Sequence, residues 1–172
     1  MKKPLGFSLL ELMVAIAVLA IVAAFAFPNF QTLVQNNRQT AKLNDLVTSL
    51  NLARSEAVTR GHRVGVCTST DGTACNGGTN WHNGWFVFLD VDDDGFGAGD
   101  EIVSRRDAFD DRMTFTTSTA TIAYRATGFK FGTLGLTLLL CDSRGTSAAR
   151  ALVVSSLGRP RTTPDASGGT CP

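Results

Sequence analysis

The sequence predicts an α+β protein in which a long N-terminal helix packs on antiparallel β-sheet. Residues 7–27 are an apolar stretch whose only charge is Glu11, and apolar side chains then recur at helical spacing up to residue 60. After Gly61 the pattern changes to short runs with a period near two. With 172 residues, 44% of them hydrophobic and 18% charged, the chain suits one folded domain and is too apolar to be disordered.

The apolar stretch predicts a membrane-spanning helix over residues 7–28, because about 20 apolar residues in a helix cross a bilayer core. Lys2 and Lys3 precede it. The positive-inside rule then keeps the N-terminus in the cytoplasm and sends the rest of the chain across the inner membrane. A secretory signal peptide is the alternative, but its apolar region is shorter and ends at a small-x-small cleavage site.

Helical periodicity continues beyond the membrane segment, so residues 7–60 are expected to be nearly one helix, kinked or locally melted at Pro28 and ended by Gly61. Residues 29–172 are then one globular domain that includes the distal half of this helix. The side chains expected on its buried face are Leu43, Leu46, Val47, Leu50, Arg54 through its stem, Ala57 and Val58.

The second part of the domain is expected to be antiparallel sheet, because most connections between its short apolar runs are too short for crossover helices. The predicted strands are residues 63–67, 85–89, 102–105, 113–117, 121–124, 136–141 and 151–155.

The cysteines predict disulfides, because all four lie on the side of the membrane segment that leaves the cytoplasm. Three pairings are compatible with the sequence. We favour Cys67 with Cys75, which closes a loop rich in Gly and Thr, and Cys141 with Cys171, which ties the C-terminal tail to a strand. A zinc site is a weaker alternative, since the chain has no CxxC pair and no histidine at ligand spacing.

An acidic segment matches the calcium-loop pattern D-x-D-x-D-G-x₅-E through Asp90, Asp92, Asp94 and Glu101. Its flanks are predicted strands, whereas an EF-hand requires helices. We therefore favour a solvated hairpin and keep calcium as the alternative. No other cofactor is expected.

The chain shows no nucleophile elbow, no P-loop and no H-E-x-x-H pair, and its two histidines offer little material for acid and base catalysis. We therefore do not expect an enzyme.

The C-terminal segment is basic, because residues 118–172 carry six basic and two acidic side chains. Its most informative part is Gly158-Arg159-Pro160-Arg161, where a strand is expected to run into an exposed loop. Two arginines two residues apart point the same way in an extended segment, and their planar forks suit phosphate oxygens. Lys130, Arg125, Arg144 and Arg150 are expected to join them in one patch. Ordinary surface arginines remain the alternative.

The N-terminal residues Lys2 to Glu11 resemble the processing signal of type IV pilins. The resemblance implies that a prepilin peptidase removes residues 1–6 by cutting between Gly6 and Phe7, and that the new N-terminal Phe7 is methylated. It also implies that Glu11 pairs with the N-terminal amine of a neighbouring subunit.

From Ala41 onwards the chain resembles the FimT and GspH-type minor pilins, through residues 83–88, 138–142 and 153–159. The resemblance implies the type IV pilin fold, and Gly158 to Arg161 match the Gly-Arg-x-Arg element by which FimT-like members bind DNA. The expected function is a minor pilin that binds extracellular double-stranded DNA without sequence preference, for uptake in natural transformation. It would sit among major and minor pilins in a pilus exposed to the periplasm and the cell surface.

The alternative function is a structural minor pilin or pseudopilin, at a filament tip or in type II secretion, that does not bind DNA. DNA binding further requires that the acidic segment of residues 90–101 and the basic tail point apart, because the acidic segment would repel DNA.

Overall fold

The computed structural model describes residues 8–109, 112–164, 169 and 171. The expected leader, its cleavage site after Gly6 and the new N-terminus at Phe7 lie outside these residues. The chain divides into two compact units, Met1–Thr40 and Ala41–Pro172. Their boundary lies within the long helix, further along the chain than residue 28.

The helix α1 spans Leu9–Arg60 without a break, so the expected local melting at Pro28 is not found. Ser8 caps its first turn, where the backbone amide of Glu11 donates to Ser8 Oγ at 3.2 Å. In the first unit, the side chains of residues 8–27 are exposed. Among the described residues, α1 is the one helix long and apolar enough to cross a membrane.

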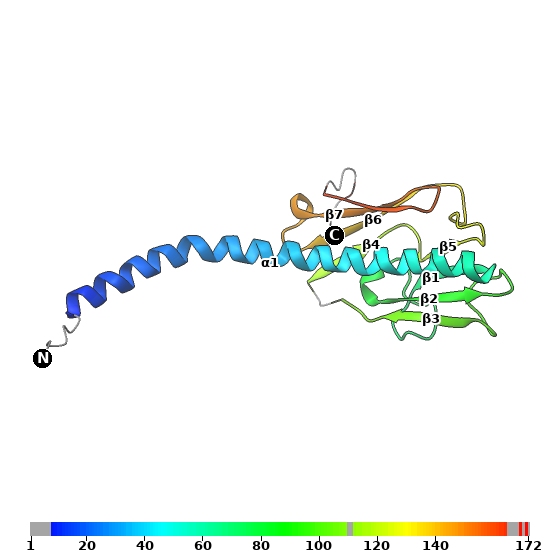
Figure 1. Ribbon diagram of the computed structural model, residues 1–172, viewed down its shortest axis with the longest axis horizontal. Coiled ribbons are helices and arrows are strands. Elements are labelled where there is room, and N and C mark those ends of the chain that lie inside the picture. Colours follow the sequence, from blue (N-terminus) through cyan, green and yellow to red (C-terminus); the bar gives the residue numbers. More distant parts are fainter. Residues whose placement is uncertain (1–7, 110–111, 165–168, 170, 172) are drawn as a thin grey trace, which may run out of the picture. The chain divides into compact units, whose positions relative to one another are not determined.

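The second unit contains two four-stranded antiparallel sheets (Figure 1). The first sheet has the order β3-β2-β1-β5 and the second the order β4-β6-β7-β8. Their bounds are β1 (Arg63–Thr68), β2 (Trp85–Asp90), β3 (Glu101–Arg106), β4 (Met113–Thr116), β5 (Thr121–Tyr124), β6 (Leu136–Asp142), β7 (Arg150–Val154) and β8 (Pro160–Thr163), with short 3₁₀ turns at Trp81–Asn83 and Thr146–Ala148. The expected strands are confirmed to within one or two residues at each end, and β8 is an additional one.

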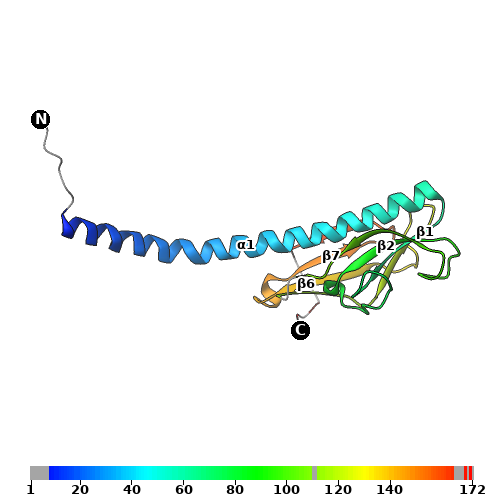
Figure 2. The same cartoon turned by 90° about the horizontal axis from the view of Figure 1, so that it is seen from below.

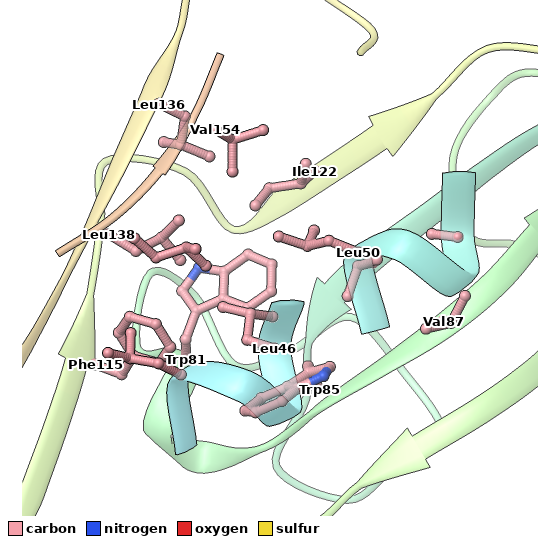
Figure 3. Close-up of a cluster of buried hydrophobic side chains, with 14 of the residues drawn as sticks. Leu46, Leu50, Trp81, Trp85, Val87, Phe115, Ile122, Leu136, Leu138 and Val154 are labelled. Carbon is pink, nitrogen blue, oxygen red and sulfur yellow. The ribbon is translucent and has the colours of Figure 1, made fainter. Parts of the chain in front are cut away.

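The C-terminal part of α1 runs along both sheets (Figure 2) and closes the main core between them. Figure 3 shows Leu46 and Leu50 directed towards Trp81, Trp85 and side chains of both sheets. Both indoles also satisfy their N–H groups, since Trp81 Nε1 donates to the Thr119 carbonyl at 2.9 Å and Trp85 Nε1 to Ser49 Oγ at 3.0 Å. The buried helix residues in this core are Leu43, Leu46, Leu50, Ala53 and Ala57.

Val58 differs from the expected helix face, because its side chain is 55% exposed. The buried stripe follows the spacing 46, 50, 53, 57, so Ala53 and not Val58 faces the core. Val58 instead lies beside the turn at Gly128. A Cβ added at Gly128 would lie 3.0 Å from the Cγ2 methyl group of Val58.

Both favoured disulfides are present, Cys67 to Cys75 and Cys141 to Cys171. Cys67 also joins a second small core with Phe86 and Phe88, on the face of the first sheet that α1 does not cover. Cys141 packs with Leu139 and Ala149 on the corresponding outer face of the second sheet. The disulfides therefore fix a loop and the C-terminal tail to the outer faces of the two sheets.

Replacing Leu50 with Ala tests the helix-to-sheet core. Leu50 is fully buried, so Leu50→Ala is expected to lower the free energy of unfolding by about 2–5 kcal/mol. The measurement is urea unfolding of the full-length protein in mild detergent, followed by the fluorescence of Trp81 and Trp85, which both lie in this core. The neighbouring exposed residue gives the control, Asn51→Ala, with an expected change within about 0.5 kcal/mol. Equal losses in the two variants would contradict the described helix orientation.

Candidate nucleic-acid interface

The basic tail is a structured hairpin, because Pro160–Thr163 pairs with β7 as the strand β8. The expectation of an exposed loop at this position is therefore wrong. In the turn before β8, the Gly158 amide donates to the Ser155 carbonyl at 2.8 Å and the Arg159 amide to Ser155 Oγ at 3.1 Å. The ladder also extends past the strand, since the Ser155 amide donates to the Arg159 carbonyl at 3.1 Å.

Gly158 is required at this turn for two reasons. Its φ of +81° lies in the left-handed region that side chains disfavour. A Cβ at this position would also lie 2.7 Å from the ring of Tyr124 and 3.0 Å from the backbone nitrogen of Lys130. Tyr124 Oη donates to the Gly158 carbonyl at 3.1 Å, so the turn is fixed directly on a core side chain.

Tyr124, which contacts this turn at Gly158, is fully buried. Burial raises its pKa to about 12 from an ordinary value of 10.0, because the phenolate is poorly solvated there. Arg54 opposes the shift, since its positive charge favours the phenolate. The phenol therefore stays a hydrogen-bond donor at neutral pH. The sequence pattern did not single out this residue, although it is the single tyrosine of the chain.

Arg159 and Arg161 project from the outer side of the hairpin. Arg161 is paired with Val153, and Val153 lies between Leu152 and Val154, which face the core. Paired residues of an antiparallel ladder share a face, so Arg161 points away from the core, and Arg159 follows at a spacing of two. Both side chains are exposed. Neither guanidinium has a hydrogen bond or ion pair with any residue that the structure describes.

Lys130 lies beside this turn, as expected. It forms a β-bridge with Tyr124, and its Nζ donates to the Phe131 carbonyl at 3.1 Å. Arg125 is in the same turn region, where both its guanidinium and that of Arg63 lie over the ring of Phe131, 5.2 and 5.0 Å from the centroid. Lys130 and Arg125 thus extend the positive charge of the hairpin turn towards β1.

Arg144 and Arg150 do not join the patch, which corrects the expectation. They lie at the other end of the β6–β7 hairpin, since Arg150 begins β7 and the turn at Gly158 follows its end. Arg144 is also bound to Asp142, with Nη2 to Oδ2 at 2.6 Å. Burial alone would raise the pKa of Asp142, but the hydrogen bonds and charge of Arg144 outweigh it and lower the pKa.

The acidic segment and the basic turn lie at the same end of the unit but belong to different sheets, since the segment joins β2 to β3 and the turn joins β7 to β8. Val64 pairs with Leu89 on one side and Tyr124 on the other, which brings the end of β2 and the end of β5 together. A recess of about 410 Å³ between them is lined by residues that include Arg63, Asp93, Arg125 and Phe131. The guanidiniums of Arg63 and Arg125 thus stand between the acidic loop and the basic turn.

The expected calcium ligands are only partly brought together. Asp90, Asp92 and Asp94 are close to one another, but the fourth carboxylate of the group is Asp100 and not Glu101. Glu101 instead accepts a hydrogen bond from Arg60 Nη1 at 2.7 Å. The first residue of β3 is thereby turned towards the end of α1, away from the acidic group.

Comparison with known proteins identifies the family. Residues 42–158 match the family model of the type II transport protein GspH, and residues 1–27 match the prokaryotic N-terminal methylation motif. The chain belongs to the GspH family. This GspH-family protein is a minor pilin or pseudopilin, and no curated protein matches its sequence.

Two crystal structures of the type IV minor pilin FimU from Pseudomonas aeruginosa share its fold. One is 22% identical with a TM-score of 0.60 and covers 75% of this chain and 90% of FimU. The other is 21% identical with a TM-score of 0.57, over 72% and 91%. The minor pseudopilin EpsH of the Vibrio cholerae Type 2 Secretion System is 12% identical with a TM-score of 0.49, over 72% and 94%. The FimU structures confirm the expected pilin fold.

Replacing Gly158 with Ala tests the turn. A Cβ there meets both a left-handed backbone and the Tyr124 ring, so Gly158→Ala is expected to lower the free energy of unfolding by about 2–4 kcal/mol. Gly61→Ala is the matched control, because Gly61 has a φ of +72° but nothing within 4 Å of its Cβ position. Its expected loss is about 1 kcal/mol by urea unfolding. Equal losses would mean that Gly158 does not pack on Tyr124.

The single tyrosine allows a direct titration. Tyrosinate absorbance of the folded protein should rise with a midpoint near 12, against an ordinary value of 10.0. The pKa is higher in the folded state, so this contribution to stability is complete below pH 10 and is lost as the pH rises to 12. Stability should therefore fall over this range in the wild type, and less so in Tyr124→Phe. A midpoint near 10 in protein that is still folded would show that the phenol is exposed.

Proposed function

We propose that this minor pilin binds double-stranded DNA through Arg159 and Arg161, without reading its sequence, as a receptor for DNA uptake in natural transformation. The observation that carries the proposal is the pair of exposed guanidiniums, free of partners among the described residues, on a hairpin that Tyr124 and Gly158 hold in place. Two arginines with the same orientation and no carboxylate partner are available to bridge adjacent phosphates.

The surroundings of the pair suit a phosphate backbone. β8 is the last strand of its sheet, so its outer edge offers backbone groups to a ligand. Gly158 and Pro160 fix the course of the chain and supply no charge. Lys130 beside the turn can reach a further phosphate once Nζ leaves the Phe131 carbonyl, which is a weak and exposed contact.

Binding by one subunit should be weak. Few phosphate contacts give a Kd on the order of 10⁻⁴ to 10⁻⁶ M that weakens steeply with salt. The acidic loop at the same end limits the direction from which a duplex can approach, and it favours contact from the β8 edge. Several subunits on one filament would raise the overall affinity, because the first contact increases the effective concentration of the second.

The N-terminal region would bring this surface to the outside of the cell. We propose that prepilin peptidase cuts between Gly6 and Phe7, and that α1 anchors the protein in the inner membrane before assembly with other major and minor pilins. The methylation motif over residues 1–27 supports this processing. Glu11 has an exposed side chain in the first turn of α1, where it could pair with the terminal amine of a neighbouring subunit. The assembled pilus would then expose the hairpin to the periplasm and the cell surface.

The competing function is a filament subunit without affinity for DNA. The match to the GspH family is compatible with this function and with DNA binding alike. Both functions use the same helix, sheets and disulfides. They differ only in the role of the hairpin arginines. No enzymatic role is proposed, since the sequence carries none of the catalytic motifs considered above.

Charge removal at the hairpin tests the proposal. The double variant Arg159→Gln/Arg161→Gln is expected to bind a short duplex at least tenfold more weakly than wild type at low salt. The slope of log affinity against log salt should fall by about two, because two phosphate contacts are lost. The measurement is fluorescence anisotropy with labelled DNA and full-length protein in detergent, over a salt series.

The matched control is Arg106→Gln/Arg112→Gln, which removes the same charge from two exposed arginines away from the hairpin. Its affinity should stay within about twofold of wild type, with unfolding curves unchanged for both double variants. If both double variants weaken binding equally, net charge and not the hairpin governs the interaction. If neither does, the protein is a structural subunit only.

A further inference from the structure

The loop between β2 and β3 gathers carboxylates into one cluster. Asp90 ends β2, and Asp92, Asp94 and Asp100 follow in the loop. One carboxylate oxygen from each of the four lies within 4.8 Å of the others. Clusters of exposed acidic side chains are common on protein surfaces, so the distances alone do not make a site.

Asp90 provides the independent observation, because its carboxylate is buried in this cluster and only half satisfied. Its side chain is 1% exposed. Oδ2 accepts hydrogen bonds from the Arg63 guanidinium, whereas Oδ1 is buried without a hydrogen-bond partner among the described residues. A buried carboxylate oxygen without a partner is costly and uncommon in folded proteins. A cation shared with the neighbouring carboxylates would supply the missing partner.

The loop is also held in shape around the cluster. Phe96 packs on Phe86 and Phe88 with ring centroids 4.7 and 5.2 Å apart, which attaches the middle of the loop to the first sheet. The amides of Val91 and Gly97 donate to the two carboxylate oxygens of Asp100 at 3.1 and 2.9 Å. Asp100 is therefore positioned beside Asp90 by the backbone of its own loop.

The cluster carries more negative charge than its partners offset. Arg63 forms an ion pair with Asp90, and its Nε lies 3.7 Å from Asp93 Oδ1. Asp92, Asp94 and Asp100 place three further carboxylates close to Asp90, and negative charges this close repel one another. A divalent cation would relieve this repulsion.

We propose that the β2–β3 loop binds Ca²⁺ through Asp90, Asp92, Asp94 and Asp100. Four carboxylates on one loop suit calcium, which takes six to eight oxygens in flexible geometry, better than magnesium, which keeps most of its waters. The group contains no histidine or cysteine, which zinc prefers. Arg63 occupies one oxygen of Asp90, so the affinity should be modest, with a Kd on the order of 10⁻⁴ to 10⁻³ M as in extracellular modules. The ion would tie the end of β2 to the start of β3.

The test is a calcium titration of the full-length protein in detergent, after removal of metal with a chelator. At 10-fold to 100-fold excess over the Kd, Ca²⁺ should raise the unfolding temperature by roughly 4–10 °C, and Mg²⁺ at the same concentration by much less. Tryptophan fluorescence follows unfolding, and isothermal titration calorimetry should give one site per chain.

Asp94→Asn is the informative variant. Without calcium it should be at least as stable as wild type, because it removes a repelling charge from an exposed position. Its calcium affinity should nevertheless fall at least tenfold. Asp107→Asn removes an exposed carboxylate outside the cluster and should keep the full response. Asp92→Asn serves as a second variant of the site should Asp94→Asn fail to fold.

The proposal is overturned if calorimetry detects no calcium binding, if Mg²⁺ and Ca²⁺ stabilise the protein equally, or if the site variants respond to calcium as Asp107→Asn does. Loss of the calcium response in the site variants alone supports it. None of these measurements involves DNA, so the outcome is independent of the proposed function.

Discussion

Leu43, Leu46, Leu50, Ala53 and Ala57 form one buried stripe of α1 that contacts both sheets, and the rest of the second unit depends on this packing. The named strands of the two sheets do not pair with each other, so the helix and the two tryptophans join them. The stripe also decides which residues of β7 face inwards. Because Leu152 and Val154 are in the core, Val153 and its partner Arg161 must face outwards. The direction of the proposed DNA-binding side chain thus follows from core packing.

A second contact fixes the position of the hairpin that carries these arginines. The phenol of Tyr124 holds the Gly158 carbonyl, and the absence of a Cβ at Gly158 lets the turn approach the ring and the backbone of Lys130. A rigid hairpin keeps two guanidiniums in place at little entropic cost to binding, which matters where few contacts are available. The same end carries the acidic loop, and the arginines over Phe131 separate the two. A cation in the acidic cluster would reduce its repulsion of DNA.

Local patterns predicted most of the fold. The helix and most strands follow from periodicity and turn residues, which are properties of neighbouring residues. The cysteines allowed three pairings, and the favoured one is confirmed. β8 was missed because Pro160 and its polar neighbours resemble a loop, and its pairing depends on β7. Arg144 and Arg150 were misplaced because nearness in sequence does not show which end of a hairpin a residue occupies. Glu101 was chosen over Asp100 because the calcium-loop spacing assumes flanking helices, whereas here Glu101 begins a strand and binds Arg60.

We propose that duplex DNA meets this protein at the β7–β8 hairpin. Nuclear magnetic resonance of protein carrying ¹⁵N-labelled arginine tests it most directly, because the guanidinium Nε–H signal of each arginine reports its own contacts. Addition of a short duplex is expected to shift the signals of Arg159 and Arg161, and to leave those of Arg106 and Arg112 unchanged. Shifts spread equally over all four, or none at Arg159 and Arg161, would contradict it.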